Sequence, residues 1–418
     1  MDKSLQLAWR NLWRNWRRTG IALTAIVLGL LLLLFFDGLY GGLDDTMYGN
    51  AVRLYGGNIQ IHAPGYRVKA NRLPLLPLDN ADEVVQAIAD FAARADPDLP
   101  HVVAAGGRIQ TGGLIASREG SYPVVITGIE PAVEASFSLQ AEHVTAGRFL
   151  QPGDGDVVLV GEALARRLEA GIGDRVTLLG KGKHATMRQR TMTIIGIYSL
   201  GVAQAEQSAV FISLAEAQSL YDLHDQVTEV AVTLDRIGGE TAVITALRAA
   251  LPAYEVDSWA TLEPGVRRAM QTEESYMQGF AVIILFIAAI GILNLMLMAV
   301  FERTREMGVL AALGMKRRRL MGLFVLEGAF IGLVGAVIGA LLGTALIWAI
   351  NRAGGIDISA MGDMGEFSAL MGDRLYPAVE TPQILLRMVT VVFIAFAASL
   401  YPAWLAARRE PAEALRHV

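Results

Sequence analysis

The chain of 418 residues contains no cysteine. Disulfides and thiolate nucleophiles are therefore excluded, and a structural zinc site would lack its commonest ligand. Charged residues make up 18% of the chain against 53% hydrophobic residues, which is too apolar for an ordinary soluble enzyme. The net charge of −5 says little about partners, because basic residues gather beside the apolar runs and acidic residues elsewhere. We expect no nucleic-acid partner.

The sequence also lacks the common motifs of covalent chemistry. It has no phosphate-binding Gly-x-x-x-x-Gly-Lys-Ser/Thr loop, no Gly-x-Ser-x-Gly and no His-Glu-x-x-His. The six histidines are scattered without the spacing of metal ligands. Acidic residues between 357 and 373 are better explained by a solvated loop than by a cation site. We therefore expect a chain that is not an enzyme, with no catalytic residue, metal site or cofactor of its own.

Four long apolar segments predict membrane-spanning helices, and the fold class is a helical membrane protein with a large α/β region. The segments cover residues 19–42, 276–301, 320–350 and 385–405. No Ala-x-Ala-like cleavage site closes the first segment, so we expect an anchor there. A cleaved signal peptide is the alternative.

The flanks of these segments predict their orientation. Lys and Arg cluster in residues 1–18, 302–319 and 406–418, and the positive-inside rule assigns such flanks to the cytoplasm. The loop 351–384 and the large region 43–275 then lie on the extracytoplasmic side. Both termini are expected in the cytoplasm.

Region 43–275 alternates between strand-like and helix-like patterns, which predicts an α/β domain. We expect a βαβ body from residues 43–118 and 223–275, with a β-rich lobe, 119–222, inserted into it. Expected helices cover 79–93, 162–168, 214–221 and 240–251. Expected strands cover 57–62, 101–115, 122–129, 157–160, 171–178, 191–198, 210–212, 229–234 and 254–257.

Residues 1–18 form an amphipathic pattern. Their apolar stripe and their opposite basic side suit a helix that lies in the lipid headgroup plane. A generic positive flank is the alternative. The residues of this expected membrane-interface helix are Trp9, Trp13 and Trp16 on the stripe and Arg14, Arg17 and Arg18 on the basic side.

The third apolar segment carries glycines at three- and four-residue spacing: Gly328, Gly332, Gly335, Gly339 and Gly343. This spacing places small residues along a helix face, so that a neighbouring helix can approach closely. We expect helix packing there.

Two polar residues lie inside the apolar segments. Asn294 is the polar residue of the second segment, and Glu327 lies about two turns inside the third. A carboxylate at that depth either pairs with a cation such as Arg303 or Arg305, or reaches back to the cytoplasmic interface.

Residues 302–319 combine charges of both signs, a short apolar helix from 307 to 313, and a stop at Gly314. A soluble partner can grip such a hairpin and pass force to both attached spans. An ordinary basic loop is the alternative.

Three motifs resemble one family. Glu302-Arg-Thr-Arg-Glu-Met-Gly-Val-Leu-Ala-Ala-Leu-Gly314 looks like a coupling segment, although many members have arginine where this chain has Ala311. Leu7-Ala-Trp-Arg-Asn-Leu-Trp-Arg-Asn-Trp-Arg-Arg18 resembles an N-terminal elbow helix, and 402–415 a closing motif. The chain thus resembles the permease subunits of the ABC transporters that include the lipoprotein-releasing permeases, the macrolide exporter MacB and the division protein FtsX. Within this family, the stretch 57–66 is more similar to the lipoprotein-releasing permeases than to the other members named.

The resemblance implies a multi-pass inner-membrane subunit that works with a separate cytoplasmic ATPase dimer, in which ATP and Mg are bound. It further implies a second permease, which is either an identical copy or a paralogue. It also implies contact with membrane lipids, and a lipoprotein cargo that is passed to a periplasmic carrier. Two alternatives stay open: an FtsX-like regulator of an envelope hydrolase, and MacB-like export of small molecules or peptides. By resemblance the ATPase would dock on Glu302, Arg303, Arg305, Glu306, Met307, Gly308, Leu310, Leu313 and Gly314.

Overall fold

The computed structural model divides the chain into two compact units, each built from segments far apart in sequence. The helical unit comprises residues within 1–44, 271–356 and 375–418, and the α/β unit residues within 45–270 and 357–374. The described residues are 16–94, 99–201, 203–236, 239–262, 264–302, 315–358 and 374–408. Most of the expected elbow helix, the coupling segment from Arg303 to Gly314, and parts of the 351–384 loop and the tail lie outside them.

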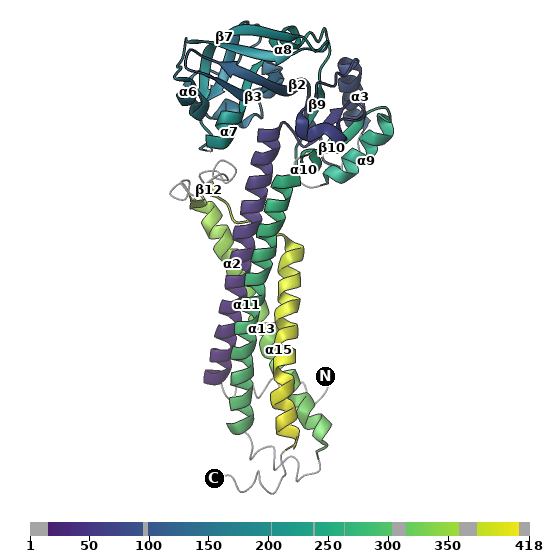
Figure 1. Cartoon of the computed structure of the whole chain (residues 1–418). Coiled ribbons are helices and arrows are strands. Elements are labelled where there is room, and N and C mark those ends of the chain that lie inside the picture. The colour runs from purple at the N-terminus through teal and green to yellow at the C-terminus, as the bar shows by residue number, and fades with distance from the viewer. Residues whose placement is uncertain are drawn as a thin grey trace. The chain divides into compact units, whose positions relative to one another are not determined.

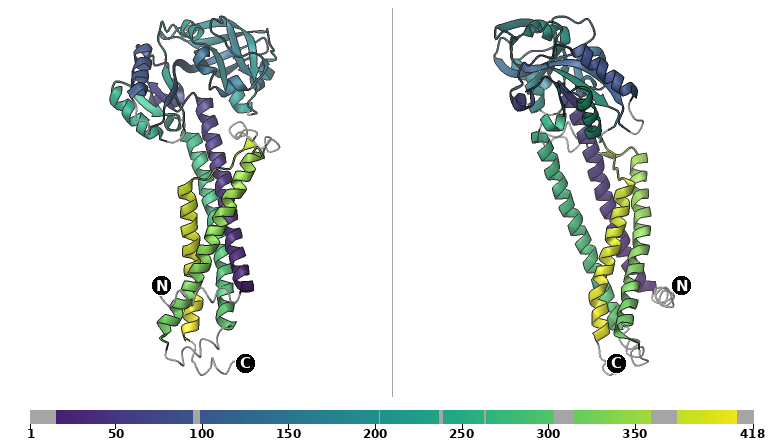
Figure 2. Two further views of the ribbon diagram at one scale, coloured as in Figure 1. Left: turned by 180° about the vertical axis from the view of Figure 1, so that it is seen from behind. Right: turned by 90° about the vertical axis from the view of Figure 1, so that its right-hand side faces the viewer.

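Long helices make up the helical unit (Figures 1 and 2). They are α2 (Trp16–Tyr55), α11 (Pro264–Glu302), α13 (Arg317–Arg352) and α15 (Thr381–Arg408). Three contain segments long and apolar enough to cross a membrane: Thr19–Leu54, Met321–Arg352 and Thr381–Leu405. Among the described residues of α11 the apolar segment is shorter, Gln278–Gly291. The fourth span therefore stays a prediction.

Two of these helices are longer than the expected spans. α2 continues past residue 42 to Tyr55, and α11 begins at Pro264, a residue suited to the first turn of a helix. Each crosses from one unit into the other as a single helix. Gly56 and Gly57 follow the end of α2 and have φ angles of 93° and 115°, which glycine adopts easily.

The body of the α/β unit is a split βαβ arrangement. Its strands are β1 (Ile59–His62), β2 (Val102–Ala116), β9 (Glu229–Leu234) and β10 (Glu255–Ser258), in the sheet order β10-β1-β9-β2 with antiparallel neighbours. α3 (Ala81–Arg94) connects β1 to β2, and α9 (Glu240–Ala250) connects β9 to β10. This is the β-α-β-β-α-β pattern of ferredoxin-like folds, with an insertion between β2 and β9.

The insertion closes into a six-stranded barrel. Around the ring the order is β2, β3, β8, β5, β7 and β6, and β6 pairs back to β2. The residues are β3 (Ser121–Ile129), β5 (Val157–Gly161), β6 (Arg175–Lys181), β7 (Met187–Tyr198) and β8 (Ala209–Ser213), with β4 (Val144–Gly147) at the edge of β7. Inward-facing side chains such as Ile126, Val160 and Ile194 fill it and join the core of the body.

One strand, β2, belongs to both sheets. Its first half, up to Arg108, pairs with β9, and its second half, from Ile109, pairs with β3. The change of partner therefore falls inside β2, while the sequence pattern suggested a boundary between 118 and 119. The turn at 117–120 looks like a domain boundary in the sequence, but it is the β2–β3 hairpin.

The other elements are short. They are η1 (Arg67–Arg72), α4 (Pro131–Glu134), α5 (Leu139–Glu142), α6 (Glu162–Leu168), α7 (Ala203–Ser208), α8 (Leu214–Tyr221), α10 (Trp259–Leu262), β11 (Ile356–Asp357) and β12 (Arg374–Leu375). The expected helices and strands of the α/β region are confirmed, mostly to within a few residues. β4 was not expected, because its four residues are largely exposed and do not alternate.

Candidate functional site

The first part of the candidate site is the contact between α13 and α2. Gly335, Gly339 and Gly343 of α13 lie against Ile26, Leu30 and Leu34 of α2, respectively. A Cβ on Gly339 would lie 3.0 Å from the Leu30 Cβ and 3.2 Å from the Val27 carbonyl oxygen. No larger residue fits at this separation, so the glycines set how closely the two helices approach.

Nearer the start of α13, the same glycine face meets α15 in the same way. A Cβ on Gly328 would lie 2.7 Å from the Ser399 Cβ, and one on Gly332 would lie 2.6 Å from the Ala395 Cβ. One face of α13 thus contacts α15 near the start of the helix and α2 farther along. All five glycines of the ridge lie at close helix contacts.

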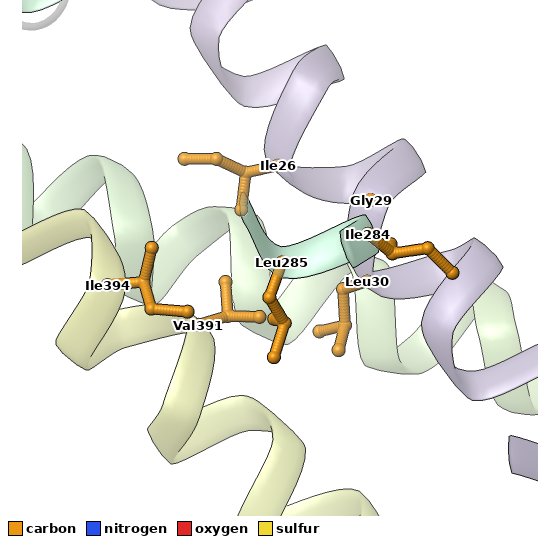
Figure 3. A pocket seen from close by; sticks show the side chains of 7 residues that line it. All are labelled: Ile26, Gly29, Leu30, Ile284, Leu285, Val391 and Ile394. Carbon is orange, nitrogen blue, oxygen red and sulfur yellow. The ribbon is translucent and has the colours of Figure 1, made fainter. Parts of the chain in front are cut away.

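The side chains of α11 that the structure describes are mostly exposed. Among its described side chains only Ala281 is buried, whereas Ile283, Phe286 and Ile287 are 56–67% exposed. Ile284 and Leu285 face the other helices across a small apolar pocket (Figure 3). The pocket is lined by Ile26, Gly29 and Leu30 of α2, Ile284 and Leu285 of α11, and Val391 and Ile394 of α15.

The two polar residues expected inside the spans occupy different environments. Glu327 is 4% exposed on α13, one residue before Gly328 of the ridge. Asn294 is exposed on α11. Arg303 and Arg305, the expected partners of Glu327, lie outside the described residues, as do all the coupling residues after Glu302, which ends α11.

An ion pair that the sequence analysis missed joins α2 to α15. Arg387 donates two hydrogen bonds to the Asp37 carboxylate, at 2.7 Å from Nε and 2.9 Å from Nη2. The two residues are 350 positions apart. The only sequence signal was that each lies at the edge of an apolar run, where an unpaired charge is costly.

Within the α/β unit, the last part of α2 contacts the helix that precedes α11. The rings of Tyr48 on α2 and Trp259 on α10 meet edge to face, with centroids 5.2 Å apart. Asn58, just after α2, accepts from the Leu234 backbone N–H at 2.8 Å and donates to Glu240 at 3.3 Å. Trp259 donates its backbone N–H to the Asn58 carbonyl. The end of α2 and α10, the short helix that precedes α11, are therefore in contact at one junction within the α/β unit.

The Tyr48–Trp259 contact predicts a measurable coupling. We expect the double-mutant cycle of Tyr48→Leu and Trp259→Leu to give an interaction free energy of about 0.5–1.5 kcal/mol, the usual range for an edge-to-face pair. The interaction free energy would be measured by chemical denaturation of the full chain in detergent, with hydrogen exchange at β10 as the local readout. Additive effects of the two substitutions would contradict a direct contact.

A buried ion pair fixes the end of α2. Arg108 of β2 is paired with Glu134 of α4, and both side chains are 6% exposed. The guanidinium lies against Gly56, where any side chain would collide with it. Burial lowers the pKa of Arg108, and the nearby charge of Glu229 opposes part of that shift. Arginine side chains remain protonated in proteins, so the pair with Glu134 is ionic. Its charge also suits the carboxyl end of a helix.

These arrangements are packing contacts and polar links between helices. In the part of the chain that the structure describes, no three His, Asp or Glu side chains lie close enough to hold a metal ion. The features found there are the close packing of α13 against α2 and α15, the Asp37–Arg387 ion pair, and a junction where α2 and α10 meet the sheet.

Comparison with known proteins matches both parts of the chain. The model of the MacB-like periplasmic core domain matches residues 19–252, more than half of the chain. The model of the FtsX-like permease C-terminal domain matches residues 279–411.

Two relatives similar in sequence agree with this. A lipoprotein-releasing system transmembrane protein LolC from Neisseria meningitidis is 25% identical over 96% of this chain and 94% of its own length. A macrolide export ATP-binding/permease protein MacB from Rhodospirillum rubrum is 25% identical over 84% of this chain and 54% of its own length. The periplasmic region of MacB from Actinobacillus actinomycetemcomitans, a solved structure, covers 52% of this chain and 95% of its own with a TM-score of 0.34 and 13% identity. The chain belongs to the ABC transporter permeases that combine a MacB-like periplasmic core domain with an FtsX-like permease domain.

Proposed function

We propose that this chain is the membrane subunit of a transporter that takes lipid-linked cargo, lipoproteins first of all, from the outer leaflet of the inner membrane. A separate cytoplasmic ATPase dimer, which binds ATP and Mg, would dock on Glu302 to Gly314. The chain would span the membrane four times with both termini in the cytoplasm, as part of a pair with a second copy or a paralogue. The α/β unit would lie in the periplasm, where it would pass the cargo to a soluble carrier.

The observation that carries this proposal is the continuity of α11. It runs for 39 residues, or about 58 Å, from Pro264 next to α10 to Glu302 at the start of the coupling segment. A push at one end of an unbroken helix reaches the other end. The second span is thus suited to transmit the ATPase stroke to the α/β unit.

The apolar character of the helices supports a lipid-linked cargo. The pocket between α2, α11 and α15 is lined entirely by glycine and aliphatic side chains. The pocket itself is small, and its lining shows the apolar character of the facing helix surfaces. Such surfaces suit contact with an acyl chain, whereas a polar solute would lose its hydration there without compensation. The LolC protein from Neisseria meningitidis, which this chain matches almost end to end, is a lipoprotein-releasing protein by name.

A second candidate is export of small molecules. A pyoverdine export ATP-binding/permease protein PvdT from Pseudomonas entomophila matches 99% of this chain, though the match covers 60% of its own length. An FtsX-like regulatory role is the remaining alternative. Purification of the tagged chain with its bound partners distinguishes these functions. Acylated lipoproteins would co-elute with a lipoprotein-releasing permease, an outer-membrane tunnel protein with a small-molecule exporter, and an envelope hydrolase with an FtsX-like regulator.

The coupling assignment has a direct test. We expect Glu306→Lys combined with Gly308→Pro to remove the ATPase from the purified complex, because one change reverses a charge and the other would break the helix expected at 307–313. Mass spectrometry of the co-purified proteins would measure the loss. Glu119→Lys, on an exposed turn of the α/β unit, is the matched charge control and should retain the ATPase. Full ATPase retention in the double variant would remove the coupling assignment.

A further inference from the structure

One side of α13 faces away from the other described helices. It carries a stripe that lies about 160° around the helix from the glycines that contact α2 and α15, at about 100° per residue. We call it the exposed stripe, and its residues are Val337, Leu341, Ala345, Trp348 and Arg352. They fall within an arc of about 80°. All five are exposed, Leu341 at 66% and Trp348 at 62%. The stripe is therefore available to a partner.

Hydrogen-bond donors gather at the end of the exposed stripe. The Arg352 guanidinium lies over the indole ring of Trp348, with its Cζ 5.2 Å from the ring centroid. Among the residues that the structure describes, neither the guanidinium nor the indole N–H has a hydrogen-bond acceptor. Both groups only donate, and the guanidinium is positively charged. The pair therefore suits an anionic partner rich in acceptor oxygens, such as a phosphodiester.

The apolar part of the exposed stripe has the length of one leaflet. From Val337 to Trp348 the helix rises about 16 Å at about 1.5 Å per residue. Half of a bilayer's hydrocarbon core is about 15 Å thick. The stripe belongs to a segment, Met321–Arg352, that is long and apolar enough to cross a membrane. Arg352 would then lie at the level of the lipid phosphates, and the apolar side chains would lie beside the acyl chains.

Polar contacts show which end of the helical unit carries the two donors. Asn351, one residue before the arginine of the stripe, donates to the Pro377 carbonyl at 2.9 Å. The next residue, Ala378, donates its backbone N–H to the Gly38 carbonyl of α2 at 2.9 Å. α2 continues from there into the α/β unit. The donors therefore lie at the end of the helical unit from which α2 continues into the α/β unit.

We propose that the exposed stripe binds a glycerophospholipid of the leaflet on the side of the α/β unit. The lipid phosphate accepts hydrogen bonds from Arg352 and Trp348, and an acyl chain lies along Leu341. Stacking on the indole holds the guanidinium plane in place, which lowers the entropy cost of binding. A second copy of the chain fits less well, because it would have to bring an acidic side chain to a level where lipids already supply phosphate. The site depends on α13 spanning the membrane and not on the cargo of the transporter.

Photo-crosslinking tests the site with a defined probe, phosphatidylglycerol that carries a photoactivatable group in one acyl chain. The full chain would be placed in nanodiscs that contain this lipid at a fraction below saturation. Peptide mass spectrometry would then map the adducts. We expect a higher yield on the exposed stripe, at Leu341, than on the face of α15 at Val389 and Phe393, which are each 66% exposed. Equal exposure makes that face the internal reference.

Two substitutions test the donors. Arg352→Gln should lower the yield on the stripe about tenfold, because a charge-assisted hydrogen bond to the phosphate is lost. Trp348→Leu should lower it about two- to fivefold, because the cation–π contact is lost. Arg94→Gln removes an exposed cation of the α/β unit and is the matched control, with the yield of the unmodified chain. The midpoint of thermal unfolding should stay unchanged in all three variants, because each side chain is exposed.

Three outcomes would overturn the site. Equal yields on the stripe and on α15 would show that lipids surround the helices without a preferred position. An unchanged yield in Arg352→Gln would show that the guanidinium holds no phosphate. The absence of native cysteine allows the third test, oxidation of Leu341→Cys in the membrane. Disulfide-linked dimers would place a second copy on the stripe, whereas a monomer with strong lipid adducts is the expected result.

Discussion

Replacement of Arg108 by methionine is expected to lower the free energy of unfolding of the α/β unit by about 3–5 kcal/mol, the usual cost of removing one partner of a buried ion pair. Glu134 would be left buried without its partner, and Glu229 would lose the nearby cation, whose Nη1 is 3.9 Å from its carboxylate. The loss should appear as a lower midpoint in chemical denaturation of the full chain. Hydrogen exchange should also quicken at the end of α2 and along β2.

Two variants make the Arg108 result interpretable. Arg108→Met combined with Glu134→Leu removes both charges, and we expect it to recover much of the lost stability, because no unpaired carboxylate is left at α4. Arg166→Met removes the cation of the exposed pair with Glu162 and should cost less than about 1 kcal/mol. A cost below 1 kcal/mol for Arg108→Met would show that the pair does not fix α2.

Gly339→Leu is expected to destabilise the helical unit by about 1–3 kcal/mol, the usual cost of overpacking, and to abolish transport. The side chain has no space on the α2 side, because its Cβ alone would lie 3.0 Å from that of Leu30. α2 and α13 would have to separate along the whole ridge. Thermal unfolding of the full chain in detergent and the amount of co-purified ATPase would measure the effect.

Size compensation tests whether the contact itself is responsible. Leu30→Ala should restore part of the stability lost in Gly339→Leu, because it removes the side chain with which the new leucine collides. Gly279→Leu on α11 is the matched control, since no atom of the described residues lies within 4 Å of a Cβ at that position. A Gly339→Leu variant as stable as Gly279→Leu would contradict the role of the ridge.

Local patterns were sufficient for much of the fold. The apolar runs and the strand and helix periodicities each depend on residues close together in sequence. The glycine spacing 335–339–343 likewise predicted a contact face before its partner was known. The partner, α2, was not predictable from this pattern, because any helix with a complementary surface would fit.

Other features depend on distant residues and had no local signal. The barrel closes because residues 113–116 of β2 pair with 177–180 of β6, a register that neither strand specifies alone. The first span was expected to cover residues 19–42, where the apolar run ends. The helix continues to Tyr55, and Gly41 and Gly42 lie against the backbone carbonyls of Ala378 and Tyr376, which are far away in sequence.

The shared strand β2 decides where this protein can be recombined with its relatives. A chimera cut at the hairpin between 118 and 119 would combine β2 of one parent with five barrel strands of the other, and mismatched side chains would meet in the barrel interior. A cut after Arg108 would instead take all six barrel strands from one parent. The junction then lies inside a strand, where successive side chains alternate between faces. Such chimeras should fold when the junction keeps the inward and outward alternation of side chains along β2. They should fail when one residue is added or removed at the junction, because every later side chain would then face the wrong side.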